Sequence, residues 1–212
     1  IYDSDLASTT TLSSLTTAST SILTFADAVT ATTYNDAGGT ATITGNLTVG
    51  DLTVGGTIST SGNTIISSTL AMNAGAFTTA GTLTTPSTPT GTGTLTTTGI
   101  AYVSDGIVTV PNGLTWSING GIEKSNGVDL TTMTIQNGGT LTHDVAGTDA
   151  DTYNQLNFTI NGNLTIDVGG TIDASGKGYL GAHQGANASD YGRTNGNTIT
   201  GGSYQFTGGS HG

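Results

Sequence analysis

The chain has 212 residues, with 3 Lys+Arg against 14 Asp+Glu and a formal net charge of −11. Lys124, Lys177 and Arg193 are its only basic side chains, so it cannot neutralise a run of phosphates. This argues against nucleic-acid binding and against docking to an anionic membrane. Cysteine is absent, so neither a disulfide framework nor a thiolate site is available.

The rest of the composition favours β-structure. The chain contains 47 Thr and 34 Gly, and Thr is common in strands while Gly is common at tight corners. No stretch has the length of a transmembrane helix, and the chain opens on Ile1 without Met or a charged leader. We therefore expect a mature polypeptide whose export signal has been removed. A cysteine-free extracellular protein fits the surface of a prokaryotic cell or a virus.

Residues 1–37 form the first segment, rich in Thr, Ser and Ala, with no glycine before Gly38. Such residues favour extended chain over helix, although a short helix is one alternative. We expect an N-terminal arm or cap. It either provides the entry strands of the repeats that follow or adds as a strand to a neighbouring subunit. The apolar residues of this assembly arm are Leu6, Leu12, Leu15, Ile22, Leu23 and Phe25.

Residues 38–100 form a Thr/Gly-rich region in which apolar residues alternate with Thr and Gly interrupts the alternation. This pattern predicts short strands joined by tight corners. Two of its phrases return later in the chain. Gly-Asn-Leu-Thr begins at Gly45 and again at Gly162, and Gly-Gly-Thr-Ile begins at Gly55 and again at Gly169. The two motifs start ten residues apart at their first occurrence and seven residues apart at their second, so the repeat varies in length.

Residues 101–175 repeat a longer phrase, in which two apolar residues flank a Thr and an Asn-Gly pair follows. The phrase starts at Val108, Met133 and Phe158. Asn-Gly readily takes positive φ, so each phrase predicts a strand, a sharp bend and a second strand. Repeats of about 20 residues cannot bury their own apolar faces and must stack. The sequence predicts an all-β fold, a β-solenoid of the right-handed parallel β-helix type, with short strands and an extended N-terminal arm.

Stacking also predicts which side chains lie over one another. We expect Trp116, Met133 and Phe158 to align in successive coils, with threonine rows facing water. Asparagines at successive corners should stack, each amide bonding the one above. The expected core ladder consists of Leu114, Trp116, Ile118, Met133, Ile135, Phe158, Ile160, Leu164 and Ile166.

Residues 176–212 lose the alternation and are rich in Gly and Asn. This composition predicts a loop and one terminal strand. The aromatic residues of this segment form a candidate patch for contact with a sugar or another subunit. They are Tyr179, Tyr191, Tyr204 and Phe206.

One acidic loop is a candidate metal site. Asp149, Asp151 and Asn154 place oxygen atoms close together, as the opening of a calcium loop does, but the glycine and the closing glutamate of such a loop are missing. We expect no cofactor, with calcium as the one candidate. His143 precedes Asp144, and adjacent strand residues point to opposite faces, so they do not form a catalytic dyad. We expect no catalytic residues and no enzymatic activity.

The motif that starts at Val108, together with the later segment Gly169-Gly-Thr-Ile-Asp-Ala-Ser-Gly-Lys-Gly-Tyr, resembles the repeat sequences of the β-helices in large bacterial surface proteins. The best known are filamentous-haemagglutinin-like adhesins and autotransporter passengers. The resemblance covers residues 100–180 and implies an extracellular structural protein that builds a surface filament, fibre or adhesin stalk, with other copies of itself as partners. The alternatives are a tailspike-like β-helix that binds or degrades surface glycans, and a trimeric viral fibre.

Overall fold

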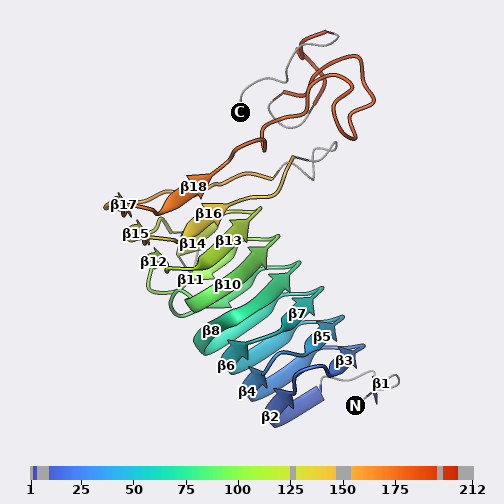
Figure 1. Ribbon diagram of the computed structural model, residues 1–212, viewed down its shortest axis with the longest axis vertical. Coiled ribbons are helices and arrows are strands. Elements are labelled where there is room, and N and C mark those ends of the chain that lie inside the picture. Colours follow the sequence, from blue (N-terminus) through green and yellow to red (C-terminus); the bar gives the residue numbers. More distant parts are fainter. Residues whose placement is uncertain (1, 4–9, 125–127, 147–153, 195–197, 205–212) are drawn as a thin grey trace.

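The computed structural model describes residues 2–3, 10–124, 128–146, 154–194 and 198–204. Within these ranges the named strands pair in parallel and form a 15-stranded sheet and a 3-stranded sheet. The strands stack as successive coils along one long axis (Figure 1). This arrangement confirms the predicted all-β solenoid. No helix in the described part of the chain is long and apolar enough to cross a lipid bilayer.

Each complete coil has three sides, which we call A, B and C. Side A comprises the first parts of β2 (Thr10–Thr17), β4 (Val29–Asp36), β6 (Leu47–Val54) and β8 (Thr64–Thr79), then β9 (Leu83–Thr85), β11 (Ala101–Val103) and β14 (Ile122–Lys124). Side B comprises the later parts of β2, β4, β6 and β8, the start of β10 (Thr90–Thr97), then β12 (Ile107–Val110), β15 (Thr132–Ile135) and β17 (Leu164–Ile166).

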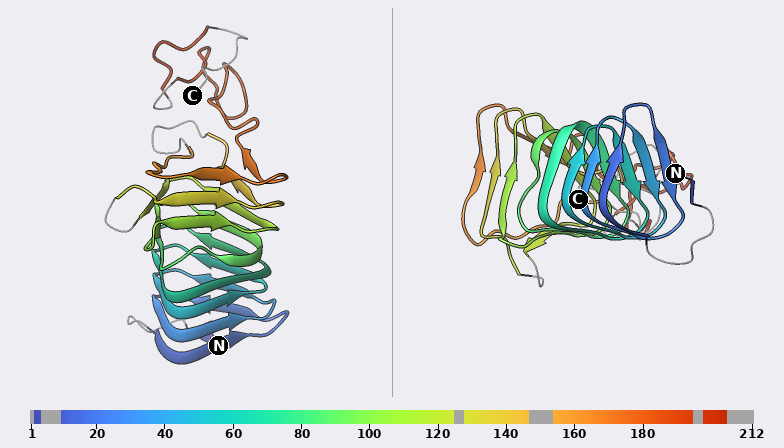
Figure 2. Two further views of the ribbon diagram at one scale, coloured as in Figure 1. Left: turned by 90° about the vertical axis from the view of Figure 1, so that its left-hand side faces the viewer. Right: turned by 90° about the horizontal axis from the view of Figure 1, so that it is seen from below.

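Side C is the longest ladder of strands, and the views in Figure 2 show it following the axis of the stack. It comprises β1 (Tyr2–Asp3), β3 (Ile22–Phe25), β5 (Thr40–Ile43), β7 (Thr57–Thr60), the ends of β8 and β10, β13 (Leu114–Ile118), β16 (Thr140–Thr142) and β18 (Thr171–Asp173).

Strands β4 and β6 turn from side A to side B without a break. In β4 the alternation of buried and outward residues shifts at Thr32 and Thr33, two outward residues in succession. In β6 the same shift falls at Gly50 and Asp51. Because period 2 sends successive side chains to opposite faces, two outward residues in a row mark a bend of the strand.

The core is a set of in-register columns that run along the axis. The central column of side C consists of Leu23, Ala41, Ile58, Phe77, Leu95, Trp116, Leu141 and Ile172. From Ala41 to Leu141 each of these side chains is fully buried. Burying a side chain of this size stabilises the fold by about 1.5–3 kcal/mol, so the column is a main source of stability.

The predicted register of residues 101–175 is wrong, although the residues chosen for its core are largely right. Met133 stacks between Val108 and Leu164, not with Trp116 or Phe158. Trp116 instead stacks with Leu141. The physical reason is that coils lengthen toward the C-terminal end, where paired residues of side C are 21 apart (95 to 116), then 25 (116 to 141), then 31 (141 to 172).

The residues of the predicted core ladder differ in how deeply they are buried. Fully buried members are Leu114, Trp116, Ile118, Met133 and Ile135. Phe158 and Ile160 precede β17 and are partly buried against the core, with Ile160 bridging to Leu130. Leu164 and Ile166 are 45% and 47% exposed. They lie in β17, the end strand of the 3-stranded sheet, where no further described strand covers them.

Glycines form a ladder at the corner between sides C and A. Gly45, Gly62, Gly81, Gly99 and Gly120 lie over one another, and Gly62, Gly81 and Gly99 each donate a backbone hydrogen bond to the glycine carbonyl below at 3.1–3.2 Å. A Cβ at Gly99 would lie 2.6 Å from the Gly81 carbonyl oxygen. The backbones of successive coils therefore approach too closely here for any side chain.

Asn46 and Asn63 stack beside this ladder, but the expected bond between their side-chain amides is not formed, because the donor is a backbone N–H. The Asn63 N–H donates to Asn46 Oδ1 at 2.8 Å, and the Thr82 N–H donates to Asn63 Oδ1 at 2.9 Å. Each side-chain amide oxygen thus satisfies a corner N–H of the next coil, which fixes the register of neighbouring coils.

Several threonines are buried, contrary to the expectation that threonine rows face water. Thr60, Thr64 and Thr79 have relative exposures of 3% or less. Their hydroxyls bond to one another, at 3.1 Å between Thr60 and Thr64 and at 3.2 Å from Thr64 to Thr79. A buried hydroxyl is tolerated when it is hydrogen-bonded, and the Thr methyl group packs like that of Val.

Two further polar groups are buried near the N-terminal end. Asp36 is 1% exposed and accepts hydrogen bonds from Gly39 N–H at 2.9 Å and Gly56 N–H at 2.7 Å, so it ties two coils together. Tyr34 is 1% exposed, and its hydroxyl accepts from Thr17 at 3.1 Å. Burial raises the pKa of Tyr34 to about 12, because the ionised phenolate would lose its hydration.

Residues expected in the N-terminal arm belong to the solenoid from Thr10 onward. Strands β2 and β3 pair in register with β4 and β5. The assembly-arm interpretation fails for Leu15, Leu23 and Phe25, because these side chains are buried in the core of their own molecule. Leu12 packs partly against the same core, Ile22 points outward at 80% exposure, and Leu6 lies outside the described residues.

Candidate functional site

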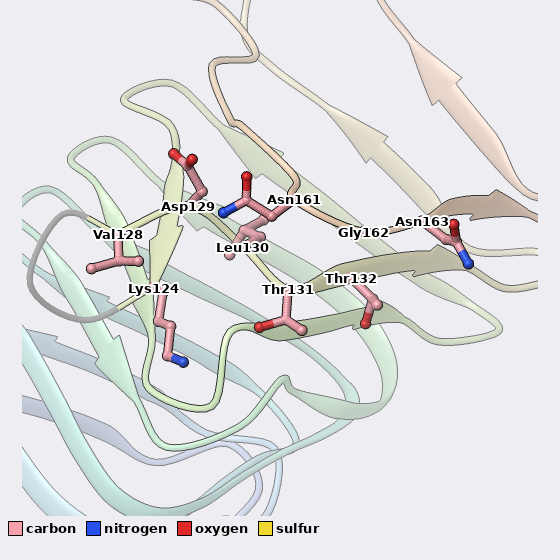
Figure 3. A pocket seen from close by; sticks show the side chains of 9 residues that line it. All are labelled: Lys124, Val128, Asp129, Leu130, Thr131, Thr132, Asn161, Gly162 and Asn163. Atoms are coloured by element: carbon pink, nitrogen blue, oxygen red, sulfur yellow. The ribbon is translucent and has the colours of Figure 1, made fainter.

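A hollow of about 400 Å³ opens on the surface beside the connection from β14 to β15 (Figure 3). Its lining comes from Lys124, from residues 128–132 and from residues 161–163. Parallel pairing fixes the last two segments, since Leu130 N–H donates to Thr159 at 2.8 Å and Asn161 N–H donates to Leu130 at 2.9 Å. The hollow is thus built from segments that connect the strands of successive coils.

The polar groups around this hollow are of several kinds. In Figure 3, Asp129 and Asn161 project toward one side of the view, and Lys124 and Thr131 toward the other. Gly106 packs against the latter pair, since a Cβ at this position would lie 2.9 Å from Lys124 Cδ and 3.1 Å from Thr131 Oγ1. The lining thus offers a carboxylate, an amide, an ammonium and hydroxyl groups as hydrogen-bond donors and acceptors.

His143 and Asp144 point to opposite faces, as predicted. His143 is 7% exposed, and its Nδ1 lies 2.8 Å from the Asp144 carbonyl oxygen. The Asp144 carboxylate instead accepts from Ser117 Oγ at 3.1 Å and from Asn119 Nδ2 at 2.8 Å, both in the preceding coil. Asp144 N–H returns a hydrogen bond to Asn119 Oδ1 at 2.9 Å. These contacts join two coils and hold the Asp144 carboxylate away from the His143 imidazole.

Asp173 ends β18 next to this group. The Ser175 N–H, which donates to Asp173 Oδ1 at 2.9 Å, is the main cause that lowers the pKa of Asp173. The Ser175 hydroxyl and the positive charges of Lys177 and His143 act in the same direction. Lys177 Nζ also donates to Thr142 Oγ1. The arrangement ties the start of the C-terminal segment to the last coils.

The predicted calcium loop is only partly described. Asp149 and Asp151 lie outside the described residues, and Asn154 donates through Nδ2 to the Val145 carbonyl at 2.9 Å. Among the residues that are described, no three His, Asp or Glu side chains gather as a metal site requires. A calcium site at Asp149 and Asp151 stays a prediction.

Part of the predicted aromatic patch does come together. The rings of Tyr191 and Tyr204 lie 5.2 Å apart between centroids at an interplanar angle of 54°, and the two residues form an antiparallel bridge. They are 43% and 56% exposed. Tyr179 is half-buried, and Phe206 lies outside the described residues. The C-terminal segment, whose backbone lies beyond β18 (Figure 1), thus contains one exposed aromatic pair among its described residues.

A buried amide organises this segment. Asn187 is 1% exposed, and its Nδ2 donates to the carbonyls of Gly181 at 2.8 Å and Tyr191 at 2.9 Å. His183 Nε2 lies 2.7 Å from Asp190 Oδ1, an exposed ion pair when the histidine is protonated.

Sequence reasoning found neither the buried Asn187 amide nor the hollow at Lys124. The only available signal for the hollow was the interruption of the repeat between β14 and β15.

The last coil is the most exposed apolar part of the stack. Leu164, Ile166 and Val168 are 45%, 47% and 96% exposed. The first two continue columns whose lower members, Met133 and Ile135, are fully buried. Their exposure follows from the free edge of β17, which no described strand pairs.

The structure places this chain among the β-solenoid proteins. Comparison with protein-family models, with curated proteins and with solved structures found no match. The fold class therefore rests on the in-register stacking of the coils.

Proposed function

We propose that this protein is an extracellular structural protein of a prokaryotic or viral surface, a rigid building block of a filament, fibre or adhesin stalk. The observation that carries the proposal is the ladder of side C, which runs in register from β3 to β18. A continuous ladder over a fully buried column makes a stiff rod, and such a rod acts mechanically, without catalytic residues. The resemblance to bacterial surface β-solenoids supports the same role.

Copies of the chain assemble through β-strand contacts at the ends of the rod. The free edge of β17 supports this step, because an unpaired strand edge with apolar residues is a template for another strand. Leu164 and Ile166 point along buried columns and are each nearly half exposed. A strand of another copy would cover them.

Introducing positive charge at the free edge of β17 tests the proposal that copies of the chain assemble end to end. Wild type is expected to form filaments in electron micrographs, and the double variant Leu164→Lys and Ile166→Lys is expected to stay monomeric with a similar thermal midpoint. Ile107→Lys is the control, because Ile107 is 49% exposed in β12, inside the stack. Wild type that stays monomeric at every concentration, or equal loss of assembly in the control, contradicts the proposal.

A second function, glycan binding, is favoured by the hollow at Lys124. Its carboxylate, amide and hydroxyl groups suit a sugar unit, and the ammonium of Lys124 suits an acidic one. A glycan array tests this function with the double variant Asp129→Ala and Asn161→Ala, and with Asn35→Ala, an exposed residue of β4, as the control. Binding by wild type that both variants retain assigns the ligand to another part of the surface.

A further inference from the structure

Side C carries a regular array of outward hydroxyl groups. In its middle column, Thr24 pairs with Thr42, Thr42 with Ser59, Ser59 with Thr78, and Thr78 with Thr96. All are exposed except Ser59 and Thr96, which are half-buried. This column is one hydroxyl per coil, without a gap, over five successive strands of the sheet.

Parallel columns flank the middle one on both sides. Two residues earlier in each strand, the outward residues are Ile22, Thr40, Thr57, Ala76 and Thr94. Two residues later they are Thr44, Ser61, Ala80 and Thr98, where backbone hydrogen bonds continue the ladder. We call these three columns the hydroxyl face. Two rows lack hydroxyls at both outer positions: β8, with Ala76 and Ala80, and β3, with Ile22 and Ala26.

The spacing of the hydroxyl face follows from strand geometry. Neighbouring strands lie about 4.8 Å apart, and alternate residues of one strand lie about 6.7 Å apart. The side chains are held in place because Thr has a stiff χ1 torsion. Beneath them, Ala41, Ile58, Phe77 and Leu95 form a fully buried layer. The result is a rigid two-dimensional lattice of hydroxyl and methyl groups.

The composition of the hydroxyl face limits the classes of ligand that it can bind. No Asp, Glu, Lys or Arg occurs in residues 22–25, 40–44, 57–61, 76–80 or 94–98, although the chain carries a net charge of −11. Ionic partners are therefore disfavoured. The outward positions also hold no aromatic ring, the side chain that stacks on the apolar face of a sugar.

The outward hydroxyls are available to a ligand. Within the described residues, the hydroxyls of Thr24, Thr42 and Thr78 make no hydrogen bond to protein, whereas the buried Thr60 and Thr79 are bonded within the core. On this face the Ser61 hydroxyl bonds the Thr44 carbonyl. A neutral lattice of free hydroxyls with methyl groups between them complements a neutral lattice of donors and acceptors.

We propose that the hydroxyl face binds ice. The repeat between coils and the repeat along each strand are close to the oxygen repeats on the prism faces of hexagonal ice, so successive hydroxyls meet equivalent water molecules. The methyl groups order the water between them. Binding improves with every added coil, because each coil adds one hydroxyl to the middle column.

An ice-recrystallisation assay on the full chain tests the proposal. Wild type is expected to inhibit crystal growth, and the double variant Thr42→Lys and Thr78→Lys is expected to need an at least tenfold higher concentration, a difference of about 1.4 kcal/mol. The matched control is Thr48→Lys with Thr84→Lys, since these outward residues of side A are also two coils apart. The control is expected to match wild type, and both variants are expected to keep the wild-type thermal midpoint.

Three results overturn the proposal. One is a wild-type protein that inhibits recrystallisation no better than an equal mass of serum albumin. Another is equal loss in both double variants, which would place the effect on no particular face. Binding to microcrystalline cellulose without inhibition of ice growth also overturns it, because it assigns the face to a polysaccharide surface. None of these results depends on filament assembly.

Discussion

A methyl group added at Gly99 directly tests how closely the coils stack. In Gly99→Ala the new Cβ would lie 2.6 Å from the Gly81 carbonyl oxygen, 2.8 Å from its carbonyl carbon and 3.0 Å from Thr82 N. All three atoms are backbone, so no side chain can rotate away. The coils must separate locally, which also weakens the hydrogen bond from Gly99 N–H to the Gly81 carbonyl, now 3.1 Å long.

The expected cost is the sum of an overpacking effect and a weakened hydrogen bond. Overpacking costs about 1–3 kcal/mol, and a backbone hydrogen bond contributes about 1 kcal/mol. The free energy of unfolding should fall by about 3 kcal/mol. For a chain of this size the thermal midpoint should fall by about 6–12 °C, measured by circular dichroism.

Gly178→Ala is the control, because nothing lies within 4 Å of a Cβ at Gly178 and its φ is not positive. Its free energy of unfolding should change by less than about 0.5 kcal/mol. If Gly99→Ala has the same midpoint as Gly178→Ala, the coils do not approach at this corner as closely as argued here.

Three further variants test the buried groups. Burial raises the pKa of Tyr34 from 10.0 to about 12. Between these pH values the unfolded chain binds fewer protons at Tyr34 than the folded chain does, so the free energy of unfolding falls as the pH rises. In Tyr34→Phe this contribution to the fall should vanish in denaturant titrations across the same pH range. Asp36→Ala leaves the N–H groups of Gly39 and Gly56 without their acceptors and should lower the free energy of unfolding by about 3 kcal/mol in urea titrations; an unchanged value would contradict the burial of Asp36. Trp116 is the only Trp and is fully buried, so its fluorescence should be blue-shifted and protected from iodide. Trp116→Ala should lower the free energy of unfolding by about 3–5 kcal/mol, and iodide quenching in the folded wild type would rule out this placement.

Sequence reasoning was sufficient for the fold class, because period-2 alternation and corner glycines are local signals. It was not sufficient for the register. The phrases at Met133 and Phe158 look alike, yet Met133 pairs with Leu164. The longer coils carry extra residues between their strands, and no local sequence pattern distinguishes an inserted motif from a stacked one.

The buried threonines also show what the sequence pattern alone could not predict. Thr60, Thr79 and Thr97 occupy successive inward positions of one column, and the members on either side of them, Ile43 and Ile118, are apolar. Alternation alone assigned threonine to the solvent side. Only the three-dimensional stacking shows that hydroxyls such as that of Thr64 find partners inside.

Paired cysteines provide the most direct test of the coil register, since the chain contains no native cysteine. Thr134 pairs with Thr165 across one coil boundary, about 4.8 Å away, which suits a disulfide. The double variant Thr134→Cys and Thr165→Cys should therefore close an intramolecular disulfide under mild oxidation. Thr134→Cys with Thr159→Cys should stay reduced, because Thr159 lies beside Leu130. The reverse pattern, with only the second pair closing, would contradict the stacking of the coils described here.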